Sequence, residues 1–274
     1  MSEQQFEFTK ENIDMYLKEL SKEYRKQVGK AMPAELILIG GAAVLINYGF
    51  RGMTTDIDAL IHAASGMKDA INRVGDRFDL PSGWLNADFA KTESYSPKLV
   101  EFSVYYKTWS NVLTVRTVAA EYLIAMKLRS GRQYKSDLSD VIGVLYEHEK
   151  RGTPIDAEQI RKAVTDLYGE WDSLPESSQA FIENVMRSGQ LAQLYTQTAA
   201  GEKETKELLL QFEQDYPGVM KEDNVDTIAG TLQKKTNRAS VLAQLRDIQH
   251  TKEDTPSPSA AIPKGDQKSK EKLT

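Results

Sequence analysis

Two aspartates separated by one residue are the side chains whose types and spacing could do chemistry. Asp56 and Asp58 lie in a run, Thr54 to Ile61, that predicts a β-strand. Successive side chains of a strand point to opposite faces, so the two carboxylates share one face while Ile57 anchors the strand in the core. Adjacent carboxylates are ligands for Mg²⁺ or Mn²⁺, and these ions neutralise phosphate oxygens during phosphoryl and nucleotidyl transfer. We therefore expect Asp56 and Asp58 to hold such a metal.

Two glycines upstream provide a place for a triphosphate. The apolar run Leu36 to Ile39 predicts a buried strand, and a helix is expected from Ala42 to Tyr48. Gly40 and Gly41 occupy the turn between them. Glycine lets a backbone approach an anion closely, and the N-terminus of a helix directs free N–H groups at phosphates. Gly40 and Gly41 are therefore predicted to bind nucleotide.

Each of these signals also has an ordinary structural explanation. Paired glycines are common in tight turns, and an isolated Asp-x-Asp is common on the polar face of a strand. The combination in this order favours a functional site, because two like charges on one face repel each other unless a cation lies between them.

In this region the sequence resembles the DNA polymerase β-type nucleotidyltransferase superfamily. The resemblance rests on Leu38-Ile39-Gly40-Gly41, on Asp56-Ile57-Asp58, and on a later stretch from Glu121 to Leu128 that is followed by Gly131, Arg132, Asp137 and Asp140. The superfamily usually has serine after the first glycine. Its small bacterial branches, including those linked to toxin–antitoxin and abortive-infection systems, often have Gly-Gly, so Gly41 is typical of these branches.

This resemblance implies a reaction and a set of partners. The reaction is the Mg²⁺-dependent transfer of a nucleoside monophosphate from an NTP to a hydroxyl. The acceptor would be RNA, tRNA included, or a protein side chain, and a cognate antitoxin would be a partner of a toxin. Two other functions stay open: a degenerate domain that binds nucleotide or a partner protein as a regulator, and an enzyme that modifies a small molecule such as an antibiotic.

The resemblance also calls for a third carboxylate on a neighbouring strand, and Glu101 is the candidate. Leu99 to Tyr106 alternates as a strand would, which places Glu101 on the face opposite Val100 and Phe102. Glu101 would then complete the metal site. A solvated strand residue is the alternative interpretation, and Asp88 is the reserve choice.

Lys127 is expected on a helix that Thr117 caps and Gly131 ends. From there its amine could reach a phosphate while its stem packs on apolar neighbours, and an ordinary surface lysine is the alternative. Asp137 and Asp140 open the next helix, where acidic residues stabilise the N-terminal dipole without a catalytic duty. We therefore assign Lys127 to nucleotide binding and leave these two aspartates out of the site.

The order of elements predicts an α/β (α+β) fold, with a mixed sheet flanked by helices. Further helices are expected at Phe8 to Ala31 and Ser65 to Phe78, and a further strand at Val112 to Val115. After residue 150 only helices are expected, and the end of the chain has too little apolar surface to repay ordering. The expected division is residues 1–150 for a nucleotidyltransferase-like domain, 151–250 for a helical domain and 251–274 for a disordered tail.

The composition limits any metal site to oxygen ligands. The 274 residues include no cysteine and three histidines, which excludes disulfides, thiolate zinc sites and cysteine nucleophiles. No apolar run approaches the roughly 20 residues of a membrane span, and the polar N-terminus lacks a leader pattern. We expect a cytoplasmic protein without a membrane partner. The net charge of −5 argues against a protein that coats nucleic acid by bulk electrostatics.

Overall fold

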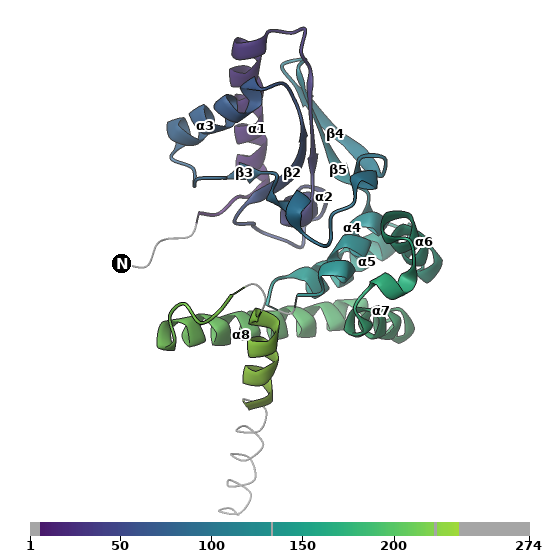
Figure 1. The fold of residues 1–274 in the computed structure, drawn as a ribbon. Helices are drawn as coiled ribbons and strands as arrows, with labels where there is room; N and C mark the ends of the chain where they lie inside the picture. Colours follow the sequence, from purple (N-terminus) through teal and green to yellow (C-terminus); the bar gives the residue numbers. More distant parts are fainter. Residues whose placement is uncertain (1–5, 133, 222–223, 236–274) are drawn as a thin grey trace, which may run out of the picture.

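The computed structural model describes residues 6–132, 134–221 and 224–235 of the chain. A five-stranded mixed sheet is flanked by helices and followed by a helical C-terminal region (Figure 1), which confirms the expected fold class. The tail expected at 251–274 and the last part of the expected helical domain, residues 236–250, lie outside the described residues.

The sheet brings the two sequence motifs to one place. Its strands are β1 (Ala34–Leu38), β2 (Ile57–His62), β3 (Leu85–Asn86), β4 (Ser103–Trp109) and β5 (Leu113–Val118), in the order β3-β2-β1-β5-β4. β1 pairs antiparallel with β2 and parallel with β5, while β3 adds to β2 in parallel and β4 to β5 in antiparallel fashion. β4 and β5 turn at Ser110 and Asn111, which both have the positive φ that two-residue hairpins need.

Helices cover both faces of the sheet, which is why β1 is apolar along most of its length. α1 (Lys10–Val28) and α3 (Gly66–Phe78) pack against each other and over one face, where Leu36 and Leu38 are buried. Ile37 joins a second core cluster together with α4 (Ala120–Ser130) and α5 (Asp137–Lys150). The short helix α2 (Gly40–Asn47) follows β1 directly and contributes to both clusters.

The later helices form a layer that begins with α4 and α5. It continues with α6 (Ala157–Tyr168), α7 (Glu176–Ser188) and α8 (Leu191–Asp215), and residues 225–235 are also helical. α8 packs along α5 and forms the long lower helix in Figure 1. The core cluster that holds Ile37 also holds Val185 of α7, so one hydrophobic core crosses residue 150, and the domain boundary there stays a prediction. No helix in the described ranges is both long enough and apolar enough to cross a membrane.

The described part of the chain also contains three single-turn helices, and one of them replaces part of an expected strand. They are η1 (Asp88–Lys91), η2 (Pro97–Val100) and η3 (Trp171–Ser173). The strand predicted from Leu99 was wrong in its first part, because η2 occupies these residues and β4 begins at Ser103. Proline at the start of η2 favours the turn, and Phe102 stacks on Tyr122 with ring centroids 3.9 Å apart.

The predicted start of α4 also differs from the structure. Thr117 belongs to β5 and accepts a hydrogen bond from the Asn47 amide at 2.9 Å, so it does not cap the helix. The N-cap residue is Ala119, which makes no side-chain cap. Gly131 ends α4 in the left-handed conformation, as expected.

Candidate active site

Asp56 and Asp58 occupy the start of β2, at the point where β1 ends and α2 begins. Asp56 is exposed just before the strand, Ile57 is fully buried, and Asp58 is half-buried. This alternation follows the expected period of two. The N–H of Ile39 donates to the Asp58 carbonyl oxygen at 3.1 Å, which fixes the start of β2 against the end of β1.

Gly40 brings the N-terminus of α2 next to the Asp58 carboxylate. Its φ is +54°, and a Cβ built on it would lie 3.7 Å from Asp58 Oδ2. The N-cap residue of α2, Ile39, supplies no side-chain cap. Because the first N–H groups of a helix have no partner within the helix, this end of α2 offers N–H groups to an anion beside Asp58.

Gly41 lies in a close-packed position that excludes a side chain. A Cβ built on it would lie 2.6 Å from Thr54 Oγ1 and 3.0 Å from Arg51 Nη2. Arg51 is held there by a hydrogen bond from Nε to the Met53 carbonyl oxygen and by an ion pair with Asp140. The serine that the superfamily usually has would displace Thr54 or Arg51, which gives a physical reason for Gly-Gly in this chain.

We expect Gly41→Ala to destabilise the protein and to weaken nucleotide binding. The added methyl group must push Thr54 or Arg51 aside, and overpacking of this kind costs about 1 to 3 kcal/mol. Gly49→Ala is the matched control, because no heavy atom lies within 4 Å of a Cβ built on Gly49. Urea unfolding measures both variants, and equal stabilities would contradict the close packing.

The pKa of the Asp58 carboxyl is raised above its usual value, because its side chain is half-buried and lies close to a second carboxylate. Burial is the largest cause, and the charge of Asp56 adds to it. A hydrogen bond from Asn86, which lies opposite Asp58 in the β2–β3 ladder, acts against the rise, as do the charges of Lys135 and Arg132. A cation between the two carboxylates would relieve their repulsion.

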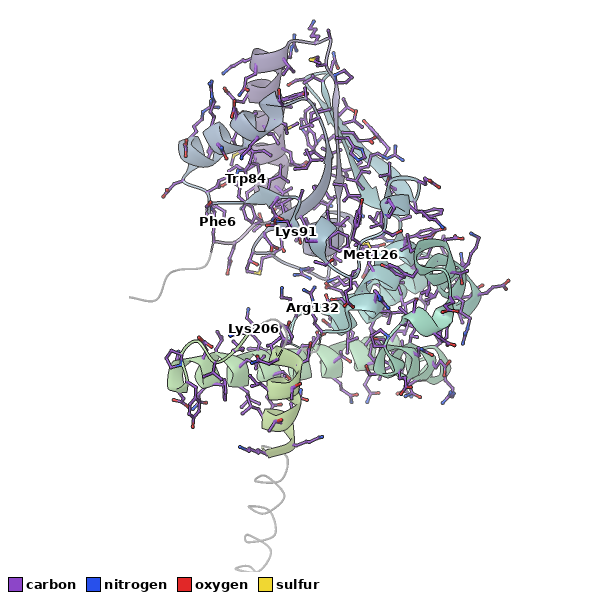
Figure 2. All side chains as sticks on the ribbon, in the orientation of Figure 1. Phe6, Trp84, Lys91, Met126, Arg132 and Lys206 are labelled. Carbon is purple, nitrogen blue, oxygen red and sulfur yellow. The ribbon has the colours of Figure 1, made fainter. Side chains whose placement is uncertain are left out.

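Arg132 and Lys135 form the basic side of the site. Both lie in the loop between α4 and α5, and Figure 2 shows Arg132 between the sheet and α8. Lys135 is exposed to solvent, but the surrounding protein partly desolvates its amine and lowers its pKa, and the charge of Arg132 lowers it further, while Asp56 and Asp58 act in the opposite direction. Two positive side chains are therefore within electrostatic reach of the two aspartates.

Lys127 is buried in an ion network behind this basic side. Its Nζ lies 2.8 Å from Asp137 Oδ1 and 2.8 Å from Asp140 Oδ2. Arg132 Nε pairs with Asp137 Oδ2 at 2.8 Å, and Arg51 pairs with Asp140. Burial alone would lower the pKa of Lys127, but Asp137 and Asp140 raise it above its usual value. A contact between Lys127 and a phosphate stays a prediction.

Asp137 and Asp140 do more than the sequence suggested. Both lie in the first turn of α5, as expected, but both are buried and serve as counter-ions for three basic side chains. The charges of Lys127 and Arg132 hold the pKa of Asp137 far below its usual range, although burial opposes them. The two aspartates therefore fix the positions of Arg51 and Arg132 on either side of the network.

Glu101 and Asp88 were expected to supply a third carboxylate. Glu101 is exposed at the end of η2 and is not on a strand. Asp88 is exposed at the start of η1 and pairs with Lys91 at 2.7 Å. Across the described ranges, no group of three or more acidic or histidine side chains is placed to hold a metal ion. The structure therefore does not bring Glu101 or Asp88 into one group with Asp56 and Asp58.

The aspartate pair still fits a magnesium ion that is shared with a substrate. Mg²⁺ is commonly held by one or two protein carboxylates, while water and substrate phosphates complete its six oxygen ligands. Asp56 and Asp58 supply two carboxylates, and Asp58 lies beside the N-terminus of α2. The donor set therefore suits an ion that arrives with a triphosphate.

A buried glutamate from α8 caps α5 next to the ion network. Glu202 Oε1 accepts hydrogen bonds from the N–H groups of Leu138 at 2.9 Å and Ser139 at 3.3 Å. The N-cap residue of α5, Ser136, makes no side-chain cap of its own. Burial raises the pKa of Glu202 to about 7, and the charge of Asp140 adds to the rise.

We expect the free energy of unfolding to fall as pH rises through about 7, because Glu202 ionises there in the folded protein. The folded-state pKa lies above the ordinary 4.5, so folding favours the protonated form. This stabilisation is fully present below the unfolded pKa and is lost above the folded one, and it amounts to about 3 kcal/mol at most. The titratable groups that face Glu202 are Asp140 on α5 and Tyr195 on α8.

Urea unfolding of Glu202→Gln over a range of pH tests this expectation. The amide stays neutral, so the variant should gain stability relative to the wild type as pH rises from about 5 to 8. Glu204→Gln is the matched control, since Glu204 is exposed on the same helix. Parallel pH profiles for the wild type and Glu202→Gln would show that Glu202 does not titrate in this range.

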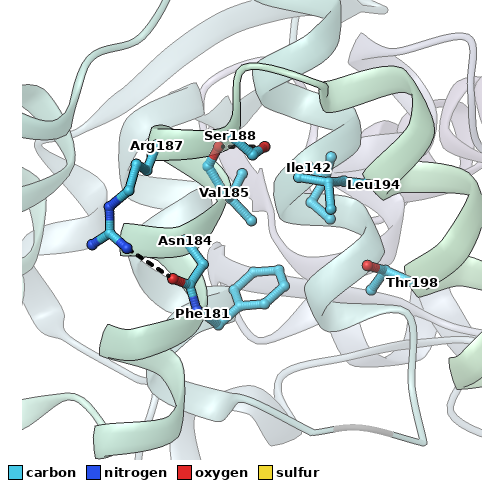
Figure 3. Close-up of a pocket in the computed structure, with 8 residues that line it drawn as sticks. All are labelled: Ile142, Phe181, Asn184, Val185, Arg187, Ser188, Leu194 and Thr198. Atoms are coloured by element: carbon cyan, nitrogen blue, oxygen red, sulfur yellow. Dashed lines mark hydrogen bonds between the residues drawn. The ribbon is translucent and has the colours of Figure 1, made fainter.

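An apolar pocket of about 620 Å³ lies between α5, α7 and α8 (Figure 3). Ile142, Phe181 and Leu194 are among the residues that line it, and Asn184 accepts a hydrogen bond from Arg187 at its wall. None of the candidate site residues lines this pocket. We interpret it as a gap in the packing of the helical layer.

Arg51, Asn86 and Glu202 contribute to the site but were missed from the sequence. Arg51 lies in an irregular loop, and Asn86 lies on a strand of two residues, too short for a periodic signal. Glu202 meets Leu138 across 64 residues of chain, so no local motif links them.

The chain matches a family of known proteins. The sequence profile of a family described as nucleotidyltransferase of unknown function (DUF6036) matches residues 15–168. This range runs from α1 to α6 and contains Gly40, Gly41, Asp56, Asp58 and Lys127. Neither the curated proteins nor the solved structures contain a significant match to the chain.

Proposed function

The chain belongs to this family of nucleotidyltransferases, and we propose on that basis that it transfers a nucleoside monophosphate from an NTP to a hydroxyl, with Mg²⁺ as cofactor. One observation carries the proposal. The Asp58 carboxylate lies beside Gly40 at the N-terminus of α2, and Asp56 lies two positions before it, immediately ahead of the strand. Carboxylates for a metal and N–H groups for a triphosphate therefore meet at one point.

Each side chain of the site has a role in this proposal. Asp56 and Asp58 would hold the metal, which supplies positive charge to the phosphate oxygens. The N–H groups at Gly40 and Gly41 bind the triphosphate, and the positive charges of Arg132 and Lys135 attract it to the site. The acceptor oxygen forms a bond to the α-phosphorus as the bond to pyrophosphate breaks, and the hydroxyl proton passes to water.

We propose RNA, tRNA included, as the acceptor, with a protein hydroxyl as the alternative. Arg132 and Lys135 support an acceptor that is rich in phosphate, because they add positive charge beside the pair in a chain of net charge −5. A toxin that modifies RNA or protein, and that a cognate antitoxin restrains, is the biological setting that fits this chemistry.

Label transfer tests the function directly. The protein is incubated with each of the four α-³²P-labelled NTPs, Mg²⁺ and either total RNA or a protein lysate, and products are separated by electrophoresis. We expect label in RNA or protein and release of unlabelled pyrophosphate. Nuclease and protease digestion then identify the acceptor, and omission of Mg²⁺ should abolish the signal.

A nucleotide-binding module without transfer is the second candidate. It is favoured by the absence, among residues 6–132, 134–221 and 224–235, of a third acidic side chain grouped with the pair. Equilibrium binding separates the two candidates. A wild-type protein that binds an NTP tightly but transfers no label to RNA, protein or a panel of small hydroxyl compounds would be such a module.

A further inference from the structure

α8 lies outside the part of the chain that the family profile matches, yet it contacts three segments of the candidate site. The first contact is the Glu202 cap on α5, whose two N–H groups belong to Leu138 and Ser139, between the two aspartates of the ion network. Glu202 is 7% exposed, and no hydrogen-bond partner is present for its Oε2 among the described residues. Burying a carboxylate costs free energy, and the two hydrogen bonds from the α5 backbone offset part of that cost.

The second contact holds the loop that carries Arg132 and Lys135. Tyr134, between these two residues, packs against a small hydrophobic cluster. The buried members of that cluster are Leu209 of α8 together with Val225 and Ala229 of the helical residues 225–235. The basic loop is therefore anchored on the C-terminal helices at its centre.

The third contact holds the segment before Arg51. Tyr195 of α8 donates a hydrogen bond to the Phe50 carbonyl oxygen at 3.4 Å, and the two rings meet edge to face with centroids 5.5 Å apart. Phe50 also fills the space that a side chain at Gly143 of α5 would need, since a Cβ there would lie 2.6 Å from the Phe50 ring. Phe50 therefore packs between α5 and α8.

We propose that α8 completes the nucleotide site, and that Glu202 is its positioning residue. By capping α5 from α8, Glu202 holds the first turn of α5 and the preceding basic loop, so that Arg132 and Lys135 face Asp56 and Asp58. This inference rests on the proposed function for its consequence in catalysis. The structural part of the inference, that the N-terminus of α5 depends on Glu202, does not require the proposed function.

The test compares three variants of the full chain. Glu202→Ala removes the acceptor, Glu202→Gln keeps an oxygen that can accept both N–H groups, and Glu204→Ala is an exposed control on α8. Hydrogen–deuterium exchange is measured at the amides of Leu138 and Ser139, and steady-state label transfer gives KM for the NTP and kcat. Hydrogen–deuterium exchange does not depend on enzyme activity, so it tests the role of Glu202 even if the protein transfers no label.

We expect Glu202→Ala to exchange at least about tenfold faster at Leu138 and Ser139, in line with the loss of a cap. KM for the NTP should rise about tenfold, with kcat changed much less, because the basic loop binds the triphosphate and does not touch the reacting bond. Glu202→Gln and Glu204→Ala should stay within about twofold of wild type in both measurements.

Three results would overturn the proposal: unchanged exchange in Glu202→Ala, unchanged KM despite faster exchange, or a KM for Glu202→Gln as high as that of Glu202→Ala. If Glu202→Ala does not fold, Tyr134→Ala makes the same test, because it releases the basic loop from the hydrophobic cluster. An unchanged KM in Tyr134→Ala would then reject α8 as part of the site. Absence of transfer in the wild type would instead reject the proposed function and leave the exchange result to judge Glu202.

Discussion

Asp56→Asn and Asp58→Asn should each reduce label transfer by about a thousandfold or more while the protein stays folded. Loss of one of two metal-binding carboxylates removes several kcal/mol of charge stabilisation, which corresponds to a change of this size in rate. Stability should not fall. Asp56 is exposed, and Asp58 has a pKa raised by burial, so a neutral amide relieves an unfavourable charge.

Label transfer and thermal melts on the same samples measure both parts of this expectation. Glu101→Gln is the matched control, because Glu101 is exposed and does not join the pair in the structure. We expect it to transfer label within about twofold of wild type. Wild-type transfer by either aspartate variant would reject the metal site, whereas a large loss in Glu101→Gln would restore Glu101 as the third ligand that the resemblance implied.

Lys127→Met should be among the most destabilising single changes in the protein. Removing one partner of a buried ion pair leaves uncompensated charge, which costs about 3 to 5 kcal/mol. Here Asp137 and Asp140 lose the amine that joins them but keep Arg132 and Arg51, so we expect the lower end of that range. A typical domain is stable by only about 5 to 15 kcal/mol.

Urea unfolding measures this cost against Lys150→Met. Lys150 is half exposed and pairs with Glu147 on the surface of α5, where such pairs contribute at most about 1 kcal/mol. A Lys127→Met protein that is as stable as Lys150→Met but no longer binds NTP would mean that Lys127 contacts a phosphate, as the sequence suggested. Loss of both stability and binding is the outcome that the ion network predicts.

The sequence predicted the parts of the site that depend on local pattern. The apolar run of β1, the two glycines and the alternation around Ile57 each follow from backbone rules that act within a few residues. Capping boxes can likewise be predicted from residues that are close together in the sequence. At the start of α6, for example, Asp156 and Gln159 are three residues apart and make the reciprocal hydrogen bonds of a capping box.

The sequence could not predict the parts that depend on contacts between distant segments. Glu101 is not on a strand, because Pro97 starts a turn and Phe102 stacks on Tyr122. The alternation of apolar and polar residues in the sequence does not show either contact. Lys127 could be placed on a helix, but its partners lie on a different helix, and whether a lysine is buried depends on what packs over it. Arg51 reaches Asp140 across 89 residues of chain, so their pairing follows only from the folded arrangement.

The 64 residues between Leu138 and its capping carboxylate give the site an order of assembly during protein synthesis. A ribosome adds about 5 to 20 residues per second, so Leu138 joins the chain about 3 to 13 seconds before Glu202 does. The aspartates, the glycines and the basic loop are all translated before the helix that holds the loop in place. A nascent chain therefore carries every proposed ligand of the nucleotide before the carboxylate that caps α5 has been made.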